Sequence, residues 1–354
     1  MENHIELAIN KCINHQIPFV AYQKESDNNI YFYSNPTPNF QQKNTDFFSI
    51  VEFNSSSQKQ HRIYFEKNAI DTIEFIEKQL EPSLKCSIEH TPHLKSTDYN
   101  SYINRSTLLI DFLKANGGKV VLSKIYCGNH NISDYYKFMA KYFAALPQTF
   151  RYMYFTHQTG LWIGATPEIL IKYDSNNQRL NTMSLAGTRQ YSKINTDWDN
   201  KNIEEHNFVT NYIVEKLSSF NLNISVSPLE SVRFGNNIEH LCSKIYAKDV
   251  PSYIIGDIMD VLNPTPALAG YPLEMAISKI ELYEDHSRIC YGGYIALNSN
   301  NNIDAYVNIR CAHFDQSSFC IYSGGGFTKD SNPYDEWDEA ENKIKILKSI
   351  FYES

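Results

Sequence analysis

The chain has 354 residues, about 2.4 times a typical domain of ~150 residues, so its length is compatible with two lobes or with one large domain. Hydrophobic residues make up 42% and aromatic residues 14% of the sequence, which is enough to fill a sizeable core and excludes a mostly disordered chain. Lysine and arginine number 32 against 40 aspartate and glutamate residues. The formal net charge of −8 therefore gives no reason to expect binding to nucleic acid or to anionic lipid.

The sequence also predicts a cytoplasmic protein without a membrane partner. It contains no run of about 18 apolar residues that would span a bilayer, and its acidic N-terminal stretch lacks the apolar segment of a signal peptide. The seven cysteines show no CxxC spacing, and their odd number argues against a disulfide framework. We therefore expect buried free thiols in a reducing compartment.

The predicted elements mix helices and strands along the chain. A short helix over 5–13 precedes β-like runs at 19–23, 30–34, 47–53 and 62–66, and helical periodicity returns at 71–80. A longer helix begins behind Ser96 and Thr97 and ends at Gly117-Gly118, where a strand over 119–126 follows. Further helices are predicted at 132–145, 204–219, 273–282 and 333–351, and strand-rich blocks at 150–156, 161–173, 223–227, 291–298, 303–314 and 318–323. Polar clusters at 174–178 and 298–302 are typical of hairpin loops, and the order is not the β-α-β alternation of a doubly wound sheet.

Two carboxylates and one ammonium group share a face of the last predicted helix. Glu336, Glu339 and Lys343 are spaced i, i+3 and i+7, behind Ser331 or Asn332 as the N-cap. A solvated face with an ion pair between Glu339 and Lys343 explains this spacing without any ligand. The alternative is that this face meets a ligand.

The residues around the start of this helix favour a ligand. Gly324-Gly325-Gly326 closes a predicted strand, so the backbone there can be approached closely and its amide groups can bind a carboxylate. The run lacks the second Gly-Lys pair of a phosphate-binding loop and does not predict a nucleotide. Trp337 indicates that the helix start is not simply surrounded by water.

A second cluster of carboxylates opens the helix predicted at 204–219. Acidic residues such as Glu204 and Glu205 are favoured at a helix N-terminus by the dipole alone. Glu205 together with Glu339 can instead hold a hard cation such as Mg²⁺, which typically takes one or two protein carboxylates. Both interpretations remain open at this point.

Three further charged residues lie in apolar segments. Arg310, in the predicted strand VNIRC, must meet an anion from the protein or from a ligand. Lys119 opens an apolar strand, where it is either an ordinary strand-end lysine or a desolvated amine with a lowered pKa. Glu168 lies between apolar residues, where a raised pKa would keep it protonated. One base and one acid in apolar settings are the minimum for replacing a hydroxyl group with water.

Taken in order, these segments resemble the chorismate-utilising enzymes, which include isochorismate, salicylate, anthranilate and aminodeoxychorismate synthases. The matching stretches are KVVLSK (119–124), GATPEIL (164–170), LAGTRQ (185–190), EEHNFV (204–209), EHL (239–241), NPTPALAGYP (263–272), YGGYIAL (291–297), VNIRCA (307–312) and SGGGFTKDSNPYDEWDEAENK (323–343). The resemblance implies an α+β fold with four α/β/β/α layers, like anthranilate synthase component I, with the active site between two large sheets. Residues 1–95 would form a variable part that contributes strands and helices, and residues 96–354 the chorismate-binding catalytic core.

The resemblance also implies a role for each matching residue. Glu205 and Glu339 resemble the ligands of a Mg²⁺ ion that binds the ring carboxylate of chorismate, with Glu336 nearby and acting through water. Arg310 resembles the clamp on the pyruvyl carboxylate. The substrate-binding positions that the resemblance implies are Gly187, Thr188, His240, Tyr291, Arg310, Gly324, Gly325 and Lys343.

The nucleophile decides which member of the family the chain resembles. Lys119 stands where water-using members have the lysine that activates water for attack at C2, and where anthranilate synthases have glutamine. Ala186 replaces the lysine of aminodeoxychorismate synthases. Glu168 resembles the acid that protonates the C4 hydroxyl as it departs. These residues imply an isochorismate synthase, with a salicylate synthase or a non-catalytic binding protein of the same fold as alternatives.

Water as the nucleophile removes the need for a glutamine amidotransferase subunit. The product would feed menaquinone, salicylate or catechol siderophores, and menaquinone is the default for a stand-alone enzyme. Leu268 and Ile309 resemble the pocket walls of isochorismate synthases. Asn263, where the family usually has histidine, and Phe327, where a smaller residue is usual, are departures that we expect to reshape the pocket or to slow release.

Overall fold

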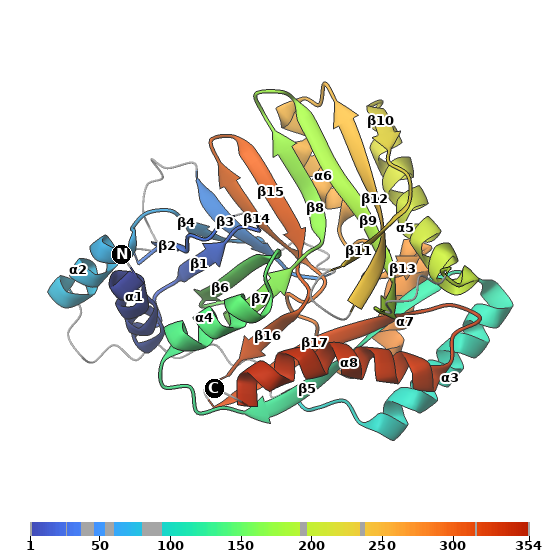
Figure 1. Ribbon diagram of the computed structural model, residues 1–354, viewed down its shortest axis with the longest axis horizontal. Coiled ribbons are helices and arrows are strands. Elements are labelled where there is room, and N and C mark those ends of the chain that lie inside the picture. Colours follow the sequence, from blue (N-terminus) through green and yellow to red (C-terminus); the bar gives the residue numbers. More distant parts are fainter. Residues whose placement is uncertain are drawn as a thin grey trace.

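The protein is described from a computed structural model, which covers residues 2–25, 27–36, 46–53, 60–79, 94–191, 197–233, 238–315 and 317–352. Its strands form two large antiparallel sheets (Figure 1). The first sheet has eight strands, in the order β13 (Gly270–Tyr271), β5 (Lys119–Asn129), β17 (Ser318–Phe327), β16 (Cys311–Phe314), β7 (Gly160–Thr166), β6 (Phe150–Thr156), β1 (Phe19–Gln23) and β2 (Tyr31–Ser34).

The second sheet has nine strands, and its longest antiparallel ladder joins β9 to β12. Its order is β10 (Asn223–Val226), β12 (Ile238–Lys248), β9 (Arg179–Gln190), β8 (Ile169–Asp174), β15 (Asn302–Val307), β14 (Tyr294–Ser299), β3 (Phe47–Val51) and β4 (Gln60–Tyr64), with β11 (Glu230–Arg233) paired to β12. The strands before residue 95 therefore extend both sheets at one edge.

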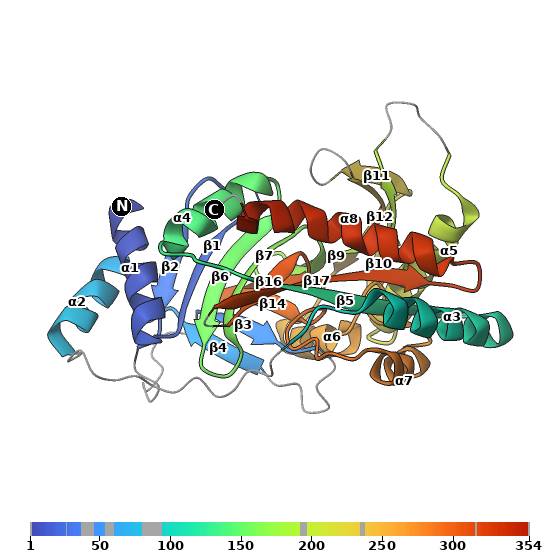
Figure 2. The same cartoon turned by 90° about the horizontal axis from the view of Figure 1, so that it is seen from below.

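Helices cover the outer faces of the two sheets (Figure 2). On the first sheet lie α1 (Glu2–His15), α2 (Ala69–Gln79), α4 (Tyr135–Ala145) and α8 (Pro333–Tyr352), while α3 (Tyr99–Asn116) and α7 (Leu273–Tyr283) pack at its β5 end. On the second sheet lie α5 (Asn200–Ser218) and α6 (Ile255–Leu262), preceded by a short 3₁₀ turn over Ser252–Ile254. Helix, sheet, sheet and helix follow one another, which is the four-layer arrangement expected.

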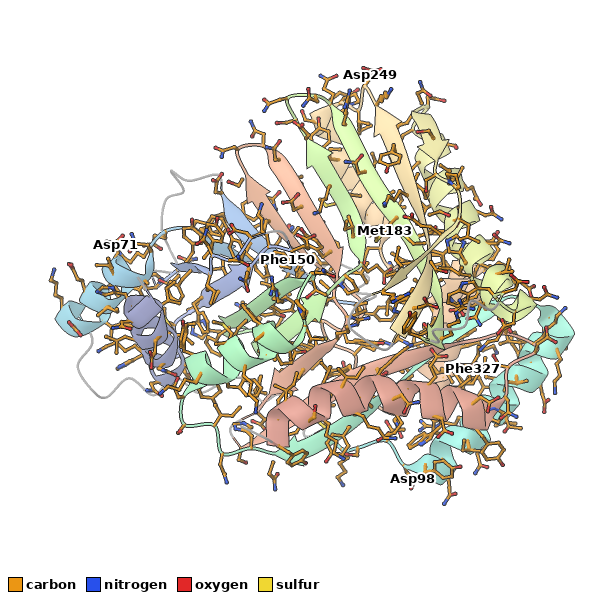
Figure 3. The ribbon with its side chains drawn as sticks, in the orientation of Figure 1. Asp71, Asp98, Phe150, Met183, Asp249 and Phe327 are labelled. Carbon is orange, nitrogen blue, oxygen red and sulfur yellow. A yellow bond between two sulfur atoms is a disulfide. The ribbon has the colours of Figure 1, made fainter. Side chains whose placement is uncertain are left out.

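Alternation along β6 builds both cores of the first sheet. Phe150, Tyr152 and Tyr154 point to the space between the sheets, whereas Met153 and Phe155 point to the helices outside. Because successive strand residues face opposite sides, a strand buried on both faces is apolar throughout. The ring of Phe150, which is labelled in Figure 3, stacks on Tyr306 of the second sheet with 4.3 Å between centroids, so the two sheets are in direct contact.

The chain crosses from one sheet to the other inside two blocks that the sequence presented as continuous. The block 161–173 is β7 in the first sheet and β8 in the second, divided at Pro167-Glu168. The block 303–314 is β15 in the second sheet and β16 in the first, divided at Asn308–Arg310. The prediction that Arg310 lies inside a strand is therefore wrong, and both crossings place a charged residue between the sheets.

Helix ends differ from the predictions in small ways. The N-cap of α3 is Asp98, whose side chain accepts a hydrogen bond from the Ser101 amide, because Ser96 and Thr97 hydrogen-bond to β5 instead. Helix α5 begins at Asn200 and not at Glu204. For α8 the predicted start at Pro333 is confirmed, and Asn332 accepts a hydrogen bond from the Tyr334 amide. The two predicted hairpin loops join β8 to β9 and β14 to β15.

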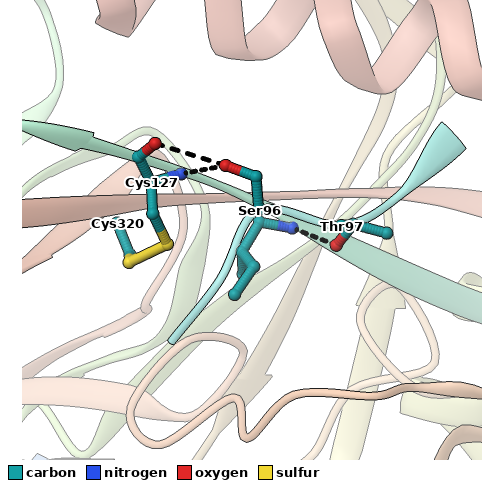
Figure 4. The surroundings of a disulfide bond; sticks show 5 residues. Ser96, Thr97, Cys127 and Cys320 are labelled. Atoms are coloured by element: carbon teal, nitrogen blue, oxygen red, sulfur yellow. Dashed lines mark hydrogen bonds between the residues drawn. A yellow bond between two sulfur atoms is a disulfide. The ribbon is translucent and has the colours of Figure 1, made fainter. Parts of the chain in front are cut away.

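The expectation of free thiols is wrong for one pair of cysteines. Cys127 of β5 and Cys320 of β17 lie directly opposite each other, with 4.1 Å between Cα atoms, and form a disulfide (Figure 4). A separation of 193 residues hides this pairing from the sequence, because only the strand register brings the two together. Four other cysteines, Cys12, Cys242, Cys290 and Cys311, are free and buried. Cys86 lies outside the described residues.

Among the described residues, no helix combines the length and the apolar character that crossing a bilayer requires.

Candidate functional site

A cavity of about 250 Å³ opens between the two sheets and the helices α5 and α8. Its walls carry the predicted site residues Glu168, Gly187, Thr188, Glu205, His240, Tyr291, Arg310, Gly324, Glu339 and Lys343. Lys119, Gly325 and Glu336 do not line it and lie just behind the wall, in contact with residues of the site. The predicted residues, which are spread over more than 200 positions of the sequence, are thus gathered at one place.

Arg310 is held at its crossing point by a strained backbone. Its φ angle is 48°, in the left-handed region that non-glycine residues seldom adopt. The carbonyl oxygen of Arg310 accepts hydrogen bonds from the Tyr142 hydroxyl at 2.7 Å and from the Ala165 amide at 3.2 Å. These contacts, from helix α4 and from β7 of the first sheet, fix the turn, and Arg310 lines the cavity.

Glu168 occupies the other crossing and has the properties of a neutral acid. Its side chain is buried, with 5% exposure, and it follows the rigid residue Pro167. Burial raises the pKa of the Glu168 carboxyl to about 8, and the nearby charges of Lys119 and Arg310 only partly oppose this shift. Glu168 is therefore mostly protonated at neutral pH and can donate a proton.

Lys119 is fully buried at the start of β5 and contacts a carboxylate of α5. Its Nζ atom lies 2.9 Å from Oε1 of Glu205. Burial acts to raise the pKa of Glu205, but the nearby ammonium groups of Lys119, Lys201 and Lys343 together leave that pKa below its ordinary value. Gly326 makes room for this pair, because a Cβ atom there would lie 2.8 Å from Cε of Lys119.

A β-bulge in β9 brings a polar cluster to the same cavity. The ladder with β12 pairs Thr188 with His240 and then Ala186 with Leu241, so Gly187, with a φ of 79°, is skipped. The Thr188 hydroxyl lies 3.2 Å from Nδ1 of His240. Burial and the charges of Arg310 and Lys343 lower the pKa of His240 to about 3, so its ring is neutral.

The face of α8 that enters the cavity carries an ion pair. Nζ of Lys343 lies 2.7 Å from Oε1 of Glu339 and donates a second hydrogen bond to the carbonyl oxygen of Gly324 at 3.0 Å. The pair that would explain this face without a ligand is therefore present, and both of its residues line the cavity, where they are partly exposed. Gly324 also packs against Tyr291, since a Cβ atom there would lie 2.9 Å from the tyrosine oxygen.

The sequence analysis missed Lys201, in the first turn of α5. It forms an ion pair with Glu336, the first-turn glutamate of α8. Burial acts to lower the pKa of Lys201, but the carboxylates of Glu336, Glu205 and Glu339 together raise it, so the ammonium form is favoured. A signal was present, because a lysine at a helix N-terminus is opposed by the helix dipole and indicates a partner of negative charge.

The residues expected to hold Mg²⁺ have suitable donor atoms. Glu205 and Glu339 both line the cavity with carboxylate oxygens, which are the ligands that Mg²⁺ prefers. Glu336 adds a buried oxygen, Oε2, that has no hydrogen-bond partner among the described residues. Within those residues no three carboxylate, imidazole or thiol groups form a ready-made metal cluster, since Glu205, Glu336 and Glu339 each contact a lysine. The donor set fits the ion in its chemistry.

The departures from the family pattern lie at different distances from the site. Phe327 does not line the cavity, and its buried ring packs beside Tyr102 in the cluster under α3. Phe327 is therefore not a wall of the cavity, and its effect on the pocket stays a prediction. Leu268 and Ile309 do line the cavity, and Asn263 lies at the C-terminal end of α6.

Comparisons with known proteins point to one family. Residues 21–352 match the family model described as chorismate binding enzyme. Isochorismate synthase MenF of Pasteurella multocida is 30% identical over 206 residues, which are 54% of this chain and 47% of that protein. Anthranilate synthase component 1 of Saccharolobus solfataricus is 27% identical over 199 residues, 53% of this chain and 47% of that protein. The chain spans about half the length of the curated relatives it matches.

Solved structures share the fold over nearly the whole chain. MenF, the menaquinone-specific isochorismate synthase from Escherichia coli, superimposes with a TM-score of 0.76 at 19% identity, covering 97% of this chain and 91% of that one. Anthranilate synthase component I from Streptococcus pneumoniae gives a TM-score of 0.63 at 15% identity over 92% and 89% of the two chains. At these identities the likeness concerns the fold.

Proposed function

Because the chain belongs to the chorismate binding enzyme family, we propose that it is an isochorismate synthase, which isomerises chorismate reversibly to isochorismate. The observation that carries this proposal is the state of Glu168. It is an acid that stays protonated at neutral pH and lines the cavity together with Arg310 and Glu205, and Lys119 contacts Glu205 from behind the wall.

Arg310 and Lys343 supply the positive charge for a substrate with two carboxylates. Arg310 binds the pyruvyl carboxylate with its planar, always charged guanidinium group, and the neutral ring of His240 lies beside it, 3.4 Å from its Nη2 atom. Tyr291, Gly187 and Thr188 line the cavity walls that would surround the ring of chorismate. The strained backbone at Arg310 keeps the guanidinium group in position before the substrate arrives.

The chemical steps need one base and one acid. Lys119 takes a proton from water as the water oxygen bonds to C2, and Glu168 donates its proton to the C4 hydroxyl, which leaves as water. The atoms balance, because one water is added and one is lost. After a turnover Lys119 holds the extra proton and Glu168 has lost one, and the reverse reaction begins from that state.

Glu205 and Glu339 would hold the Mg²⁺ ion, with Glu336 behind them. A bound Mg²⁺ would neutralise the ring carboxylate of chorismate and compete with Lys119 for the Glu205 carboxylate. With Glu205 bound to the ion, the Lys119 amine would be available to take a proton from water.

Two residues support water over ammonia as the nucleophile. Lys119 stands where ammonia-using anthranilate synthases have glutamine, and Ala186 lines the cavity where aminodeoxychorismate synthases have lysine. We therefore expect no amidotransferase subunit. The similarity to proteins named isochorismate synthase MenF, one of which is described as menaquinone-specific, supports a role in menaquinone biosynthesis. The cytoplasm is the compartment that we propose for this role.

Product analysis tests this function. Purified protein incubated with chorismate and Mg²⁺ should form isochorismate, separated from chorismate by liquid chromatography, and the reverse reaction should reach the same ratio. Addition of EDTA should stop the conversion, and excess Mg²⁺ should restore it. Absence of isochorismate would overturn the proposal, and release of pyruvate without a second protein would identify a salicylate synthase instead.

A further inference from the structure

Lys201 and Glu336 join the first turns of α5 and α8 behind the cavity wall. They form an ion pair in which the Glu336 side chain is 1% exposed and that of Lys201 is 27% exposed. Neither residue lines the cavity. Figures 1 and 2 both show the start of α8 beside the start of α5, and this pair is a direct link between the two helix ends.

The position of the pair relative to the other carboxylates is regular. Lys201 lies four residues before Glu205 on α5, and Glu336 lies three residues before Glu339 on α8. Residues at these spacings share a helix face about one turn apart. The ion pair is thus one turn before each of the two carboxylates that line the cavity, and it sets how far apart the two helices hold them.

Three contacts hold the Glu336 side chain in place. Its Oε1 atom accepts a hydrogen bond from Ser331 at 2.9 Å in addition to the lysine contact. Its Oε2 atom packs against the backbone of β17, where a Cβ atom at Gly325 would lie 2.7 Å away. Gly325 is therefore glycine because Glu336 occupies the space, and this contact ties the pair to the sheet.

We infer that Lys201 is a positioning residue, which through Glu336 holds Glu205 and Glu339 at the separation that a divalent cation needs. This inference rests on the proposed function for the cation itself. It differs from the view that Glu336 is a third ligand restrained by Lys201. The two views predict opposite results when the lysine is removed, because a restrained ligand would be released from its competing ammonium group and would become available to the cation.

Direct cation binding distinguishes these views without measuring activity. Mn²⁺ alone would be titrated into the protein and the free ion followed by electron paramagnetic resonance. Lys201→Met should weaken Mn²⁺ binding about 10-fold or more, the usual effect of losing a residue that supports a metal ligand. Lys201→Arg should restore most of the affinity. Lys78→Met, which removes an exposed ion pair with Glu74 on α2, is the matched control and should have no effect.

Unchanged or tighter Mn²⁺ binding by Lys201→Met would overturn the positioning role. If that variant fails to fold, Ser331→Ala keeps the test, because it loosens Glu336 without changing any charge. It should weaken Mn²⁺ binding to a smaller extent than Lys201→Met, and unchanged binding would contradict the inference. The double exchange Lys201→Glu with Glu336→Lys should recover Mn²⁺ binding if the pair only positions the helices, and should abolish it if Glu336 is a ligand.

The outcomes separate this inference from the proposed function. If wild type forms no isochorismate but Lys201→Met still weakens Mn²⁺ binding, the function fails and the positioning role stands. If isochorismate forms and Lys201→Met binds Mn²⁺ as wild type does, the positioning role fails and the function stands.

Discussion

The two sides of the cavity treat their carboxyl groups in opposite ways. At the crossing between the sheets, Glu168 forms no ion pair with any described residue, and burial among apolar groups keeps it protonated. At the helix ends, Glu205, Glu336 and Glu339 are each matched with a lysine. Burial still raises the pKa of Glu336 to about 7, although Lys201 opposes this shift, so the contrast is sharpest between Glu168 and Glu205. An apolar setting controls whether a carboxyl group carries a proton, whereas an ion pair controls where a charged carboxylate lies. The same residue type therefore serves as an acid on one side and as a candidate cation ligand on the other.

The largest expected effect concerns stability and pH. The pKa of Glu168 is about 8 in the folded protein and 4.5 as the ordinary value, so folding favours its protonated form. The stabilising contribution of the neutral carboxyl is complete below pH 4.5 and is lost as the pH rises through 8. Glu168→Gln cannot ionise. Its free energy of unfolding relative to that of wild type should therefore increase over this window by an amount on the order of 5 kcal/mol. Urea unfolding at several pH values measures the difference, and a constant difference from pH 5 to pH 9 would contradict it.

The next effect is on the chemical step. Glu168→Gln and Lys119→Gln should each lower kcat at least ~100-fold, the usual contribution of a positioned acid or base, with little change in substrate binding. Steady-state kinetics with chorismate and binding of an unreactive analogue separate the two quantities. If only KM changed, neither residue would be an acid or a base, and the contrast between the two sides of the cavity would lose its functional meaning.

A smaller effect is expected on the helix side. Glu339→Gln removes a carboxylate charge but keeps the shape, so the Mg²⁺ concentration for half-maximal activity should rise about 10-fold while kcat at saturating Mg²⁺ falls less. Titration of Mg²⁺ at fixed chorismate gives this value. A loss of kcat that no concentration of Mg²⁺ relieves would indicate that Glu339 acts in the chemical step and not in binding the cation.

The contrast also explains which parts the sequence could predict. Apolar neighbours of Glu168 and Lys119 are local in the chain, so their burial could be expected from short segments. The β-like runs likewise identified most strands, although not β9 or β12. The division of 161–173 and 303–314 between two sheets could not be seen, because a strand buried on both faces is apolar throughout and carries no mark of the sheet it joins.

Contacts between residues far apart in the sequence could not be predicted either. The lysine of the pair between Lys201 and Glu336 was missed, and the disulfide between Cys127 and Cys320 was contrary to expectation, since both depend on which elements become neighbours. The triple glycine was noted for ligand access, but its middle residue serves a packing need. Gly325 admits the Glu336 side chain, and only the folded arrangement of β17 and α8 reveals this.

The smallest expected effect tests whether every ion pair at the helix ends holds structure. Lys343 and Glu339 are 28% and 29% exposed, so solvent screens their attraction, and pairs of this kind contribute about 1 kcal/mol or less. Lys343→Met should therefore change the free energy of unfolding by no more than that, while raising KM for chorismate because the cavity loses a positive charge. Lys201→Met, which strands the nearly fully buried Glu336, should cost about 3–5 kcal/mol. Urea unfolding of both variants measures the two costs. Equal losses of stability would show that the difference in exposure does not matter, and that Lys343 stabilises the fold as much as Lys201 does.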